Sequence, residues 1–333
     1  MNTKETRIRE IDIVKGIVIL FVVIGHGYSG WTNIGVLING FHVPFFFIIS
    51  GIIYGQKECD FRFDFWRKVK TLIAPYFFYE VLWLLFIGLL NIKNNNWNAI
   101  EIVKRTFLFK GNFATWYLPC TFGAEFIFWI ALHTHKLKCY IIVIGFALGL
   151  IVPTYLNSNG IVLSRVLVGM GFFAIGYFGY DFFRIKYCKS VYMILTVIYG
   201  IITIKNGLIK FFIGEYGNII LFVISSVIGS YLILRFCDGI TYVARECKGF
   251  DRICLYLSYW GRSSLTIMCI HMFVIEMIRI IDYKFFNNSL PKFGACEGIF
   301  IGGICMICCD IVLFATKYFH LKYGGKFFIP NHN

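Results

Sequence analysis

Apolar stretches of about bilayer length recur along the whole chain, and this pattern restricts the fold more than any other feature. An α-helix needs about 20 apolar residues to cross the hydrocarbon core of a bilayer. Hydrophobic residues make up 58% of the chain and charged residues only 15%, whereas charged residues are about a quarter of a soluble protein. We therefore predict an all-α fold, a polytopic membrane helical bundle with about ten transmembrane helices. The expected spans are approximately 13–29, 34–55, 71–90, 113–134, 138–156, 160–183, 188–205, 216–236, 262–282 and 294–316.

The distribution of basic residues predicts the orientation of these spans. Lys and Arg collect on the cytoplasmic side of membrane proteins. With the N-terminus inside, the basic segments 57–70, 184–189 and 235–262 all fall in the cytoplasm. Both termini are then cytoplasmic, and 91–112 lies outside, where it is expected to form a short amphipathic helix. The net charge of +14 fits this topology and anionic membrane lipid, and it gives no argument for a nucleic-acid partner. We expect a multi-pass protein of the inner (cytoplasmic) cell membrane.

The remaining composition predicts a single integral membrane domain over residues 1–333. No repeat, low-complexity linker or soluble segment interrupts the hydrophobic pattern. The first apolar run has no small-residue cleavage site, so no cleavable signal peptide is expected. Most of the twelve cysteines are scattered through apolar spans, which implies no disulfide framework. The spacing closest to a metal site is that of Cys305, Cys308 and Cys309, but it lacks a second pair or a nearby histidine, and we predict no metal.

Lys15 and His26 lie in the first span, eleven residues apart. Eleven helical steps return to within about 20° of the starting direction and rise about 16 Å, so both side chains share one face. Ionisable groups inside a membrane are costly and usually functional. A cation near one surface and an imidazole near the other indicate a site that crosses the membrane, and Asp12, one turn before Lys15, is placed to orient it. Singly, each residue also fits a simpler role: an anchor for Lys15, an interfacial histidine for His26, a helix-start carboxylate for Asp12.

A third ionisable candidate, His42, precedes the sequence VPFFFIISG at the outer end of the second span. Pro44 and Gly51 are expected to interrupt this aromatic helix, and interrupted helices are tolerated where protein or a water-filled cavity receives the freed backbone groups. His26 and His42 are then expected to approach the same outward-facing pocket. The alternative for His42 is a hydrogen-bonded loop residue.

Arg67 and Lys70 are one helical turn apart at the predicted cytoplasmic mouth of the third span. Two cations in this arrangement suit the binding of phosphates. Anchoring of the span by the positive-inside rule explains them as well.

Further polar residues lie in the later spans. Trp116 and Arg165 are expected at the outer ends of their helices, and Arg165, a charge inside a span, is expected to pair with Glu125. Ser264 opens the ninth span, and His271 follows it at about the middle. Arg165 and His271 also fit structural polar contacts between helices.

The order of several segments resembles the membrane acyltransferase-3 family, and within it the group around fucose 4-O-acetylase. These segments are REIDIVKGIVILFVVIGH, FHVPFFFIISG, RKVKTLIAPY, WYLP, FFAIGY and WGRSSLTIMCIH. The resemblance covers nearly the whole chain. It implies a ten-helix membrane O-acyltransferase that takes an acetyl or other short acyl group from cytoplasmic acetyl-CoA or another acyl-CoA. The implied acceptor is a sugar hydroxyl of a cell-surface glycan or its lipid-linked precursor.

By position, the basic residue and histidine that the family requires become Lys15 and His26. The paired arginines at the start of the third span become Arg67 and Lys70. The lysine is a departure, since it keeps the charge but loses the bidentate fork of arginine. Some relatives append a soluble extracytoplasmic domain, and we expect none here.

The predicted residues suit this chemistry on their own terms. Acyl transfer from a thioester to an alcohol needs a base, and His26 has a suitable ordinary pKa; whether it acts as base or carries the acyl group stays open. Lys15, Arg67 and Lys70 are expected to bind the anionic donor. Candidate contacts to the acceptor are His42, Trp116, Arg165, Glu125, Ser264 and His271. The competing prediction is a transporter or flippase, which intramembrane charges and broken helices also fit, although no inverted repeat is visible.

Overall fold

The computed structural model describes residues 3–27, 33–55, 63–90, 98–134, 136–156, 160–285 and 297–323. Every regular element in these ranges is a helix, and the only β feature described is an isolated bridge between Lys210 and Glu215. The all-α prediction is confirmed for this part of the chain. Among the described residues, six helical segments are long and apolar enough to cross a membrane: Asn33–Gly55, Phe65–Leu90, Ile161–Phe178, Ile219–Glu246, Ser264–Phe285 and Glu297–Tyr318. The count of ten spans and the cytoplasmic termini stay predictions.

The chain divides into two compact units, the first of residues 1–45, 186–209 and 220–333 and the second of residues 46–185 and 210–219. Helix α3 (His42–Gly55) passes from the first unit to the second. The prediction of a single membrane domain is not tested by this division. The other helices of the first unit are α1 (Thr3–Gly27), α2 (Asn33–Asn39), α10 (Lys189–Asn206), α11 (Ile219–Glu246, from its second residue), α12 (Lys248–Arg262), α13 (Ser264–Phe285) and α14 (Glu297–Tyr323).

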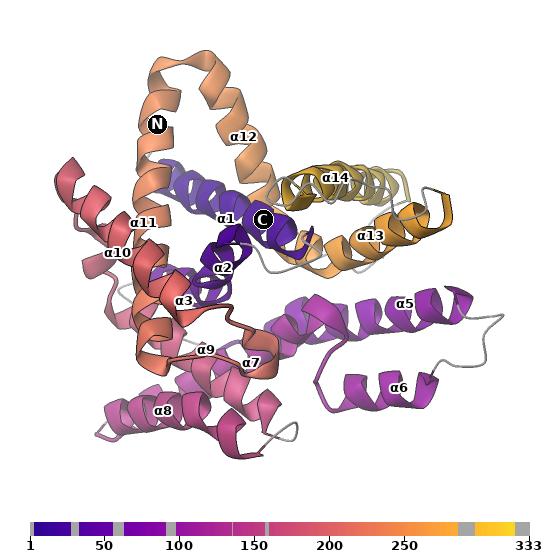
Figure 1. Cartoon of the computed structure of the whole chain (residues 1–333), viewed down its shortest axis with the longest axis horizontal. Coiled ribbons are helices and arrows are strands. Elements are labelled where there is room, and N and C mark those ends of the chain that lie inside the picture. Colours follow the sequence, from indigo (N-terminus) through magenta and orange to yellow (C-terminus); the bar gives the residue numbers. More distant parts are fainter. Residues whose placement is uncertain are drawn as a thin grey trace. The chain divides into compact units, whose positions relative to one another are not determined.

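Helix α1 is the centre of the first unit, where it packs against α12, α13 and α14 (Figure 1). Two glycines let α1 and α12 approach until their backbones touch. A Cβ atom at Gly16 would lie 1.9 Å from the carbonyl oxygen of Leu257, and one at Gly261 would lie 1.7 Å from that of Asp12. Small residues allow such close approach between membrane helices. The crossing therefore fixes Asp12, and the turn that carries Lys15, against the end of α12.

The second span is interrupted, but not where the sequence predicted. Helix α2 ends at Asn39 and α3 begins at His42, so the break lies at Gly40 and Phe41. Pro44 lies in the first turn of α3, where its missing N–H would have no helical partner. The helix continues through Gly51, where a Cβ atom would lie 2.0 Å from the carbonyl oxygen of Phe173 in α9. The prediction for Pro44 and Gly51 is therefore wrong: one starts the helix, and the other permits close packing.

Besides the end of α3, the second unit contains a group of three packed helices and one further packed pair. Helix α7 packs against α8 and α9, α8 packs against α9, and α5 packs against α6. The bounds are α4 (Phe65–Lys68), the π-helix η1 (Val69–Ile73), α5 (Ala74–Leu90), α6 (Ala99–Phe107), the 3₁₀-helix η2 (Phe113–Trp116), α7 (Tyr117–His133), α8 (Lys138–Leu156), α9 (Ile161–Phe178) and the 3₁₀-helices η4 (Phe182–Arg184) and η5 (Phe211–Ile213).

The third predicted span begins with an irregular turn. Residues Val69–Ile73 form a π-helix, in which the N–H of Ala74 bonds to the carbonyl of Val69 five residues earlier. Pro75 follows directly, and a proline ring clashes with the carbonyl four residues before it in a regular α-helix. The wider π turn accommodates this proline. It also shifts the phase of α5 relative to the preceding α4.

Helix α6 confirms that a short helix forms within 91–112. Its exposed side chains include Ile100, Val103 and Phe107, which lie on one face, while Thr106 is buried. The helix is therefore amphipathic. Its predicted place on the outer side of the membrane stays a prediction.

Candidate functional site

Lys15 and His26 lie on one unbroken helix, α1. The eleven-residue spacing therefore places them on the same face of an observed helix. Lys15 is half-buried and lies within charge-interaction range of Asp12, which in turn interacts with Arg262 at the end of α12. The structure thus brings Asp12, Lys15 and Arg262 together at the glycine crossing.

At the other end of α1, His26 meets a histidine of α13. The ring centroids of His26 and His271 are 5.2 Å apart, with the planes inclined at 41°. His26 is exposed, whereas His271 is completely buried. Arg279, also on α13, donates from Nη2 to the backbone carbonyl of His26 at 3.4 Å. The end of α1 is therefore held against α13, with His26 keeping exposed surface as a residue.

His42 joins this pair. It is buried, and its Nδ1 lies 2.9 Å from the carbonyl oxygen of Ile38. His42 and His26 are close enough for their charges to interact, and His271 interacts with both. The first unit thus gathers His26, His42 and His271 at one place, although no group of three or more His, Cys, Asp or Glu in the described residues has the arrangement of a metal site. Sequence reasoning expected the approach of His26 to His42 but not that of His271.

Ser264 lies seven residues before His271 on the same helix. Two helical turns separate them, so they share a face of α13. Ser264 is buried as the first residue of that helix. The structure therefore places both predicted residues of the late motif on one line along α13.

At the start of the third span, the basic residue that is largely buried is not one of the two that the sequence predicted. Arg67 and Lys70 are exposed, while Lys68 between them is largely buried and forms an ion pair with Glu125 of α7. The ammonium group of Lys68 also lies 5.5 Å from the ring centroid of Tyr54. Spacing within one helix favoured Arg67 and Lys70, which lie one turn apart, and gave no signal for Lys68.

The predicted pair of Arg165 with Glu125 is wrong. Arg165 is buried and donates from Nη1 to the carbonyl of Lys110 at 2.9 Å and from Nη2 to the carbonyl of Phe212. Its guanidinium group lies 4.9 Å from the ring centroid of Trp116. Backbone carbonyls and an aromatic face offset the burial of this charge in place of a carboxylate. Trp116 and Arg165 do lie together, but as parts of a closed contact.

A buried carboxylate that sequence reasoning missed organises the neighbouring loop. Glu80 of α5 is 1% exposed and accepts hydrogen bonds from Thr106 Oγ1 at 2.8 Å, from the backbone N–H of Asn112 at 2.9 Å, and from the side chains of Asn112 and Thr115. The loop that it holds contains two residues other than glycine with positive φ, Phe109 at 54° and Phe113 at 56°. No local pattern marks Glu80, because all its partners lie 26 or more residues away in the sequence.

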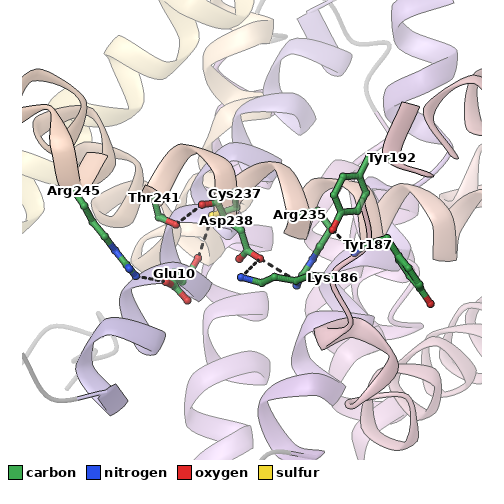
Figure 2. A network of polar contacts seen from close by, with 9 residues as sticks. All are labelled: Glu10, Lys186, Tyr187, Tyr192, Arg235, Cys237, Asp238, Thr241 and Arg245. Atoms are coloured by element: carbon green, nitrogen blue, oxygen red, sulfur yellow. Dashed lines mark hydrogen bonds and ion pairs between the residues drawn. The ribbon is translucent and has the colours of Figure 1, made fainter. Parts of the chain in front are cut away.

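A second polar network lies in the first unit, around Asp238 of α11 (Figure 2). Its carboxylate forms ion pairs with Arg235, at 3.0 Å, and with Lys186, at 3.4 Å. Nearby, Arg245 approaches Glu10 of α1 at 3.6 Å. These pairs join α1, α11 and the segment before α10, at a level that the sequence assigns to the cytoplasm. Three basic residues here therefore serve ion pairs in addition to any role in topology.

Comparison with known proteins gives one match. A family model described as an acyltransferase domain, that of the acyltransferase-3 family, matches residues 8–314. No curated protein and no solved structure matches the chain. The matched residues run from the first turns of α1 through most of α14, so they include every candidate residue described above. With six helical segments suited to cross a bilayer in its described part and a match over nearly its whole length, the chain belongs to the acyltransferase-3 family and is a multi-pass membrane acyltransferase.

Proposed function

We propose that this acyltransferase moves an acetyl or other short acyl group from coenzyme A to a sugar hydroxyl of a cell-surface glycan or its lipid-linked precursor. The observation that carries the proposal is the exposed imidazole of His26, which shares a helix face with Lys15 and lies beside His271. An accessible histidine backed by buried polar groups suits general-base catalysis. The proposal places the protein in the cytoplasmic membrane, with the donor arriving from inside.

The proposed reaction needs one base and a leaving thiol. A ring nitrogen of His26 takes the proton of the sugar hydroxyl, and the sugar oxygen attacks the thioester carbonyl. The carbon–sulfur bond breaks, and His26 returns the proton to the departing sulfur as free coenzyme A. A covalent acyl-His26 intermediate is the other form of the same reaction, and a burst of thiol release before turnover would reveal it.

The donor is proposed to bind through cations. Arg67 and Lys70 are exposed, so their charges are accessible to the phosphates of coenzyme A. Lys15 is half-buried and interacts with Asp12, which supports a role in binding the anionic donor, with Asp12 orienting its ammonium group.

Each unit by itself holds polar or aromatic side chains that are candidates for contact with the acceptor. His42 and Ser264 are the candidates near the histidine cluster. In the second unit they are Trp116, Arg165 and Glu125. The last two already have protein partners, so the proposal for them requires those partners to be exchanged or shared.

The decisive test is the release of free thiol from acetyl-CoA by purified protein in the presence of a glycan acceptor. The variant His26→Ala should lower the rate by about 100-fold or more, the usual share of a general base. His133→Ala is the matched control, because His133 is an exposed histidine at the end of α7 whose Nδ1 bonds only locally, to the carbonyl of Trp129. Equal rates for both variants would remove His26 from the mechanism.

The donor proposal has its own test. Replacing Arg67 or Lys70 with Ala should raise the KM for acetyl-CoA and leave the KM for the acceptor unchanged, because the lost contact is to one substrate only. Lys136→Ala provides the control, since Lys136 is an exposed basic residue of another loop. An effect of all three variants on expression alone would support membrane anchoring instead.

The break of the second span at Gly40 and Phe41 also fits a transporter, in which discontinuous helices line substrate sites. An assay in proteoliposomes distinguishes the two functions. A transporter would move the sugar across the bilayer without consuming acetyl-CoA. The proposed enzyme would release one thiol for each ester that it forms.

A further inference from the structure

We propose that His271 is the positioning residue for His26: in the working state its Nε2 accepts a hydrogen bond from one ring nitrogen of His26, which leaves the other His26 nitrogen free to act as base. This inference deepens the proposed function and rests on it.

The surroundings of His271 fix its tautomer. Its Nδ1 lies 3.0 Å from the carbonyl oxygen of Ile267, one turn earlier on α13. A carbonyl oxygen can only accept, so Nδ1 carries the proton. In a neutral imidazole the other nitrogen then has a free lone pair. His271 is thus presented as a hydrogen-bond acceptor through Nε2.

That acceptor has no partner among the residues that the structure describes. The Nε2 atom is buried, and His271 has no exposed surface. Leaving a buried polar atom unpaired is costly, and most such atoms in folded proteins are satisfied. An unpaired acceptor is explained if a donor reaches it in another state of the enzyme.

His26 is the donor within reach. Its ring centroid lies 5.2 Å from that of His271, so a rotation of the exposed His26 ring can bring one nitrogen of each to hydrogen-bonding distance. The backbone of His26 is meanwhile tied to α13 through Arg279. The ring can therefore turn about a fixed attachment.

The other groups around His271 do not supply this donor. Cys305 of α14 donates its thiol to the backbone carbonyl of His271 at 3.4 Å, not to the ring. His42 has its own Nδ1 bonded to Ile38. Arg279 is directed to the carbonyl of His26 and to Glu276. Among the described residues, His26 alone combines a ring contact to His271 with an exposed position.

The hydrogen bond would act when the reaction generates charge. As His26 takes the hydroxyl proton it becomes an imidazolium, and the Nε2 lone pair of His271 stabilises the N–H on the far side of the ring. No proton moves to His271, and the proton on His26 passes to the sulfur of coenzyme A. His271 thus orients the base and favours its charged form without touching substrate.

The experiment uses two polar variants of matched chemistry. His271→Gln places an amide oxygen near the position of Nε2 and keeps an acceptor for His26. His271→Asn is shorter, so its amide can replace the bond to Ile267 but has no acceptor at the Nε2 position. His271→Leu removes both. Thermal unfolding in detergent identifies any variant that fails to fold.

The proposal expects kcat to fall by about 10- to 100-fold in His271→Asn and His271→Leu, as for outer partners of other functional histidines, with both KM values near wild type. His271→Gln should recover most of kcat. Wild-type kcat in the Asn variant would overturn the proposal, and so would an equal loss in Asn and Gln, since that pattern marks packing.

A spectroscopic readout separates this inference from the proposed function. In ¹⁵N-histidine-labelled protein, the resonances of His26 are assigned by their loss in His26→Asn. They should shift in His271→Asn and stay near wild type in His271→Gln. Unchanged His26 resonances in both variants would overturn the pairing. If His26→Ala keeps full activity, the proposed function fails, while the spectrum still reports whether the two histidines are bonded.

Discussion

Glu80 in the second unit and His271 in the first are both completely enclosed polar side chains, and they are satisfied to opposite degrees. Glu80 accepts four hydrogen bonds from Thr106, Asn112 and Thr115. His271 has one ring nitrogen bonded within its own helix and the other unpaired among the described residues. Both carboxylate oxygens of Glu80 are bonded within the fold, whereas Nε2 of His271 has no partner among the described residues.

This difference indicates which buried polar groups are available to take part in a reaction. A buried carboxylate with every oxygen occupied holds its surroundings rigid, and its bonds have no capacity left for a substrate. A buried imidazole with a free lone pair lowers stability, and such a group is retained where function needs it. The exposed His26 beside His271 supports this interpretation for the first unit, whereas Glu80 is best understood as the organiser of its loop.

The largest effect is expected at the glycine crossing that holds the first unit together. In Gly261→Leu the new Cβ would lie 1.7 Å from the carbonyl oxygen of Asp12, so α1 and α12 must separate. We expect loss of more than about 3 kcal/mol of stability, beyond ordinary overpacking, seen as aggregated protein in size-exclusion chromatography. Gly239→Leu is the control, since a Cβ there meets nothing within 4 Å. Equal behaviour of the two variants would show that the crossing does not hold the Lys15 turn of α1 against α12.

The next largest effect tests Glu80 as an organiser. Glu80→Gln keeps the shape but replaces one accepting oxygen with a donor, which then faces the donors of Thr106 and Asn112. We expect a loss of about 3 kcal/mol, measured by denaturant titration in micelles. Glu101→Gln, at an exposed carboxylate of α6, should change stability by less than about 0.5 kcal/mol. An equally small loss of stability for Glu80→Gln would show that Glu80 does not organise its loop, and its contrast with His271 would be lost.

The ion pair of Lys68 with Glu125 lies between these extremes and sharpens the comparison. Breaking a buried pair by removing one partner costs about 3 kcal/mol, because the other charge is left uncompensated. Lys68→Met and Glu125→Gln should each show this loss. The double variant should lose clearly less than the sum, which a double-mutant cycle measures. Additive losses would mean that the two charges are not coupled.

The two units also differ in how far the sequence predicted them. The Lys15–His26 register follows from helix geometry alone, and α1 has the expected unbroken form. In the basic segment before Pro75, the sequence could not show that Lys68 is the residue directed to Glu125. Its direction depends on contact with α7 and not on spacing within its own helix. Glu80 was missed for the same reason, since its partners are distant in sequence.

The break in the second span shows a related limit. Proline and glycine were expected to interrupt the helix, yet Pro44 lies in a first turn and Gly51 in a close contact with Phe173. Both residues have two uses, and only the neighbouring helices decide between them. The candidate site was therefore predictable where one helix defines it and not where several helices meet.

The smallest expected effect on stability is at His271, and it bears most directly on the comparison with Glu80. His271→Gln replaces an imidazole whose Nε2 is unpaired in the described structure with an amide that can reorient. Little bonding is lost, since the ring bonds only to backbone of its own helix, at Ile267 and Met268, and we expect a change within about 1 kcal/mol in either direction. His271→Leu removes the unpaired atom altogether, so its destabilisation should stay within the same range while its turnover falls. Groups kept for function commonly show this opposition of stability and activity. Denaturant titration in micelles, as for Glu80, measures the change in stability of both His271 variants. A loss at His271 as large as that of Glu80→Gln would mean that the imidazole supports the fold, and the contrast between the two buried groups would disappear.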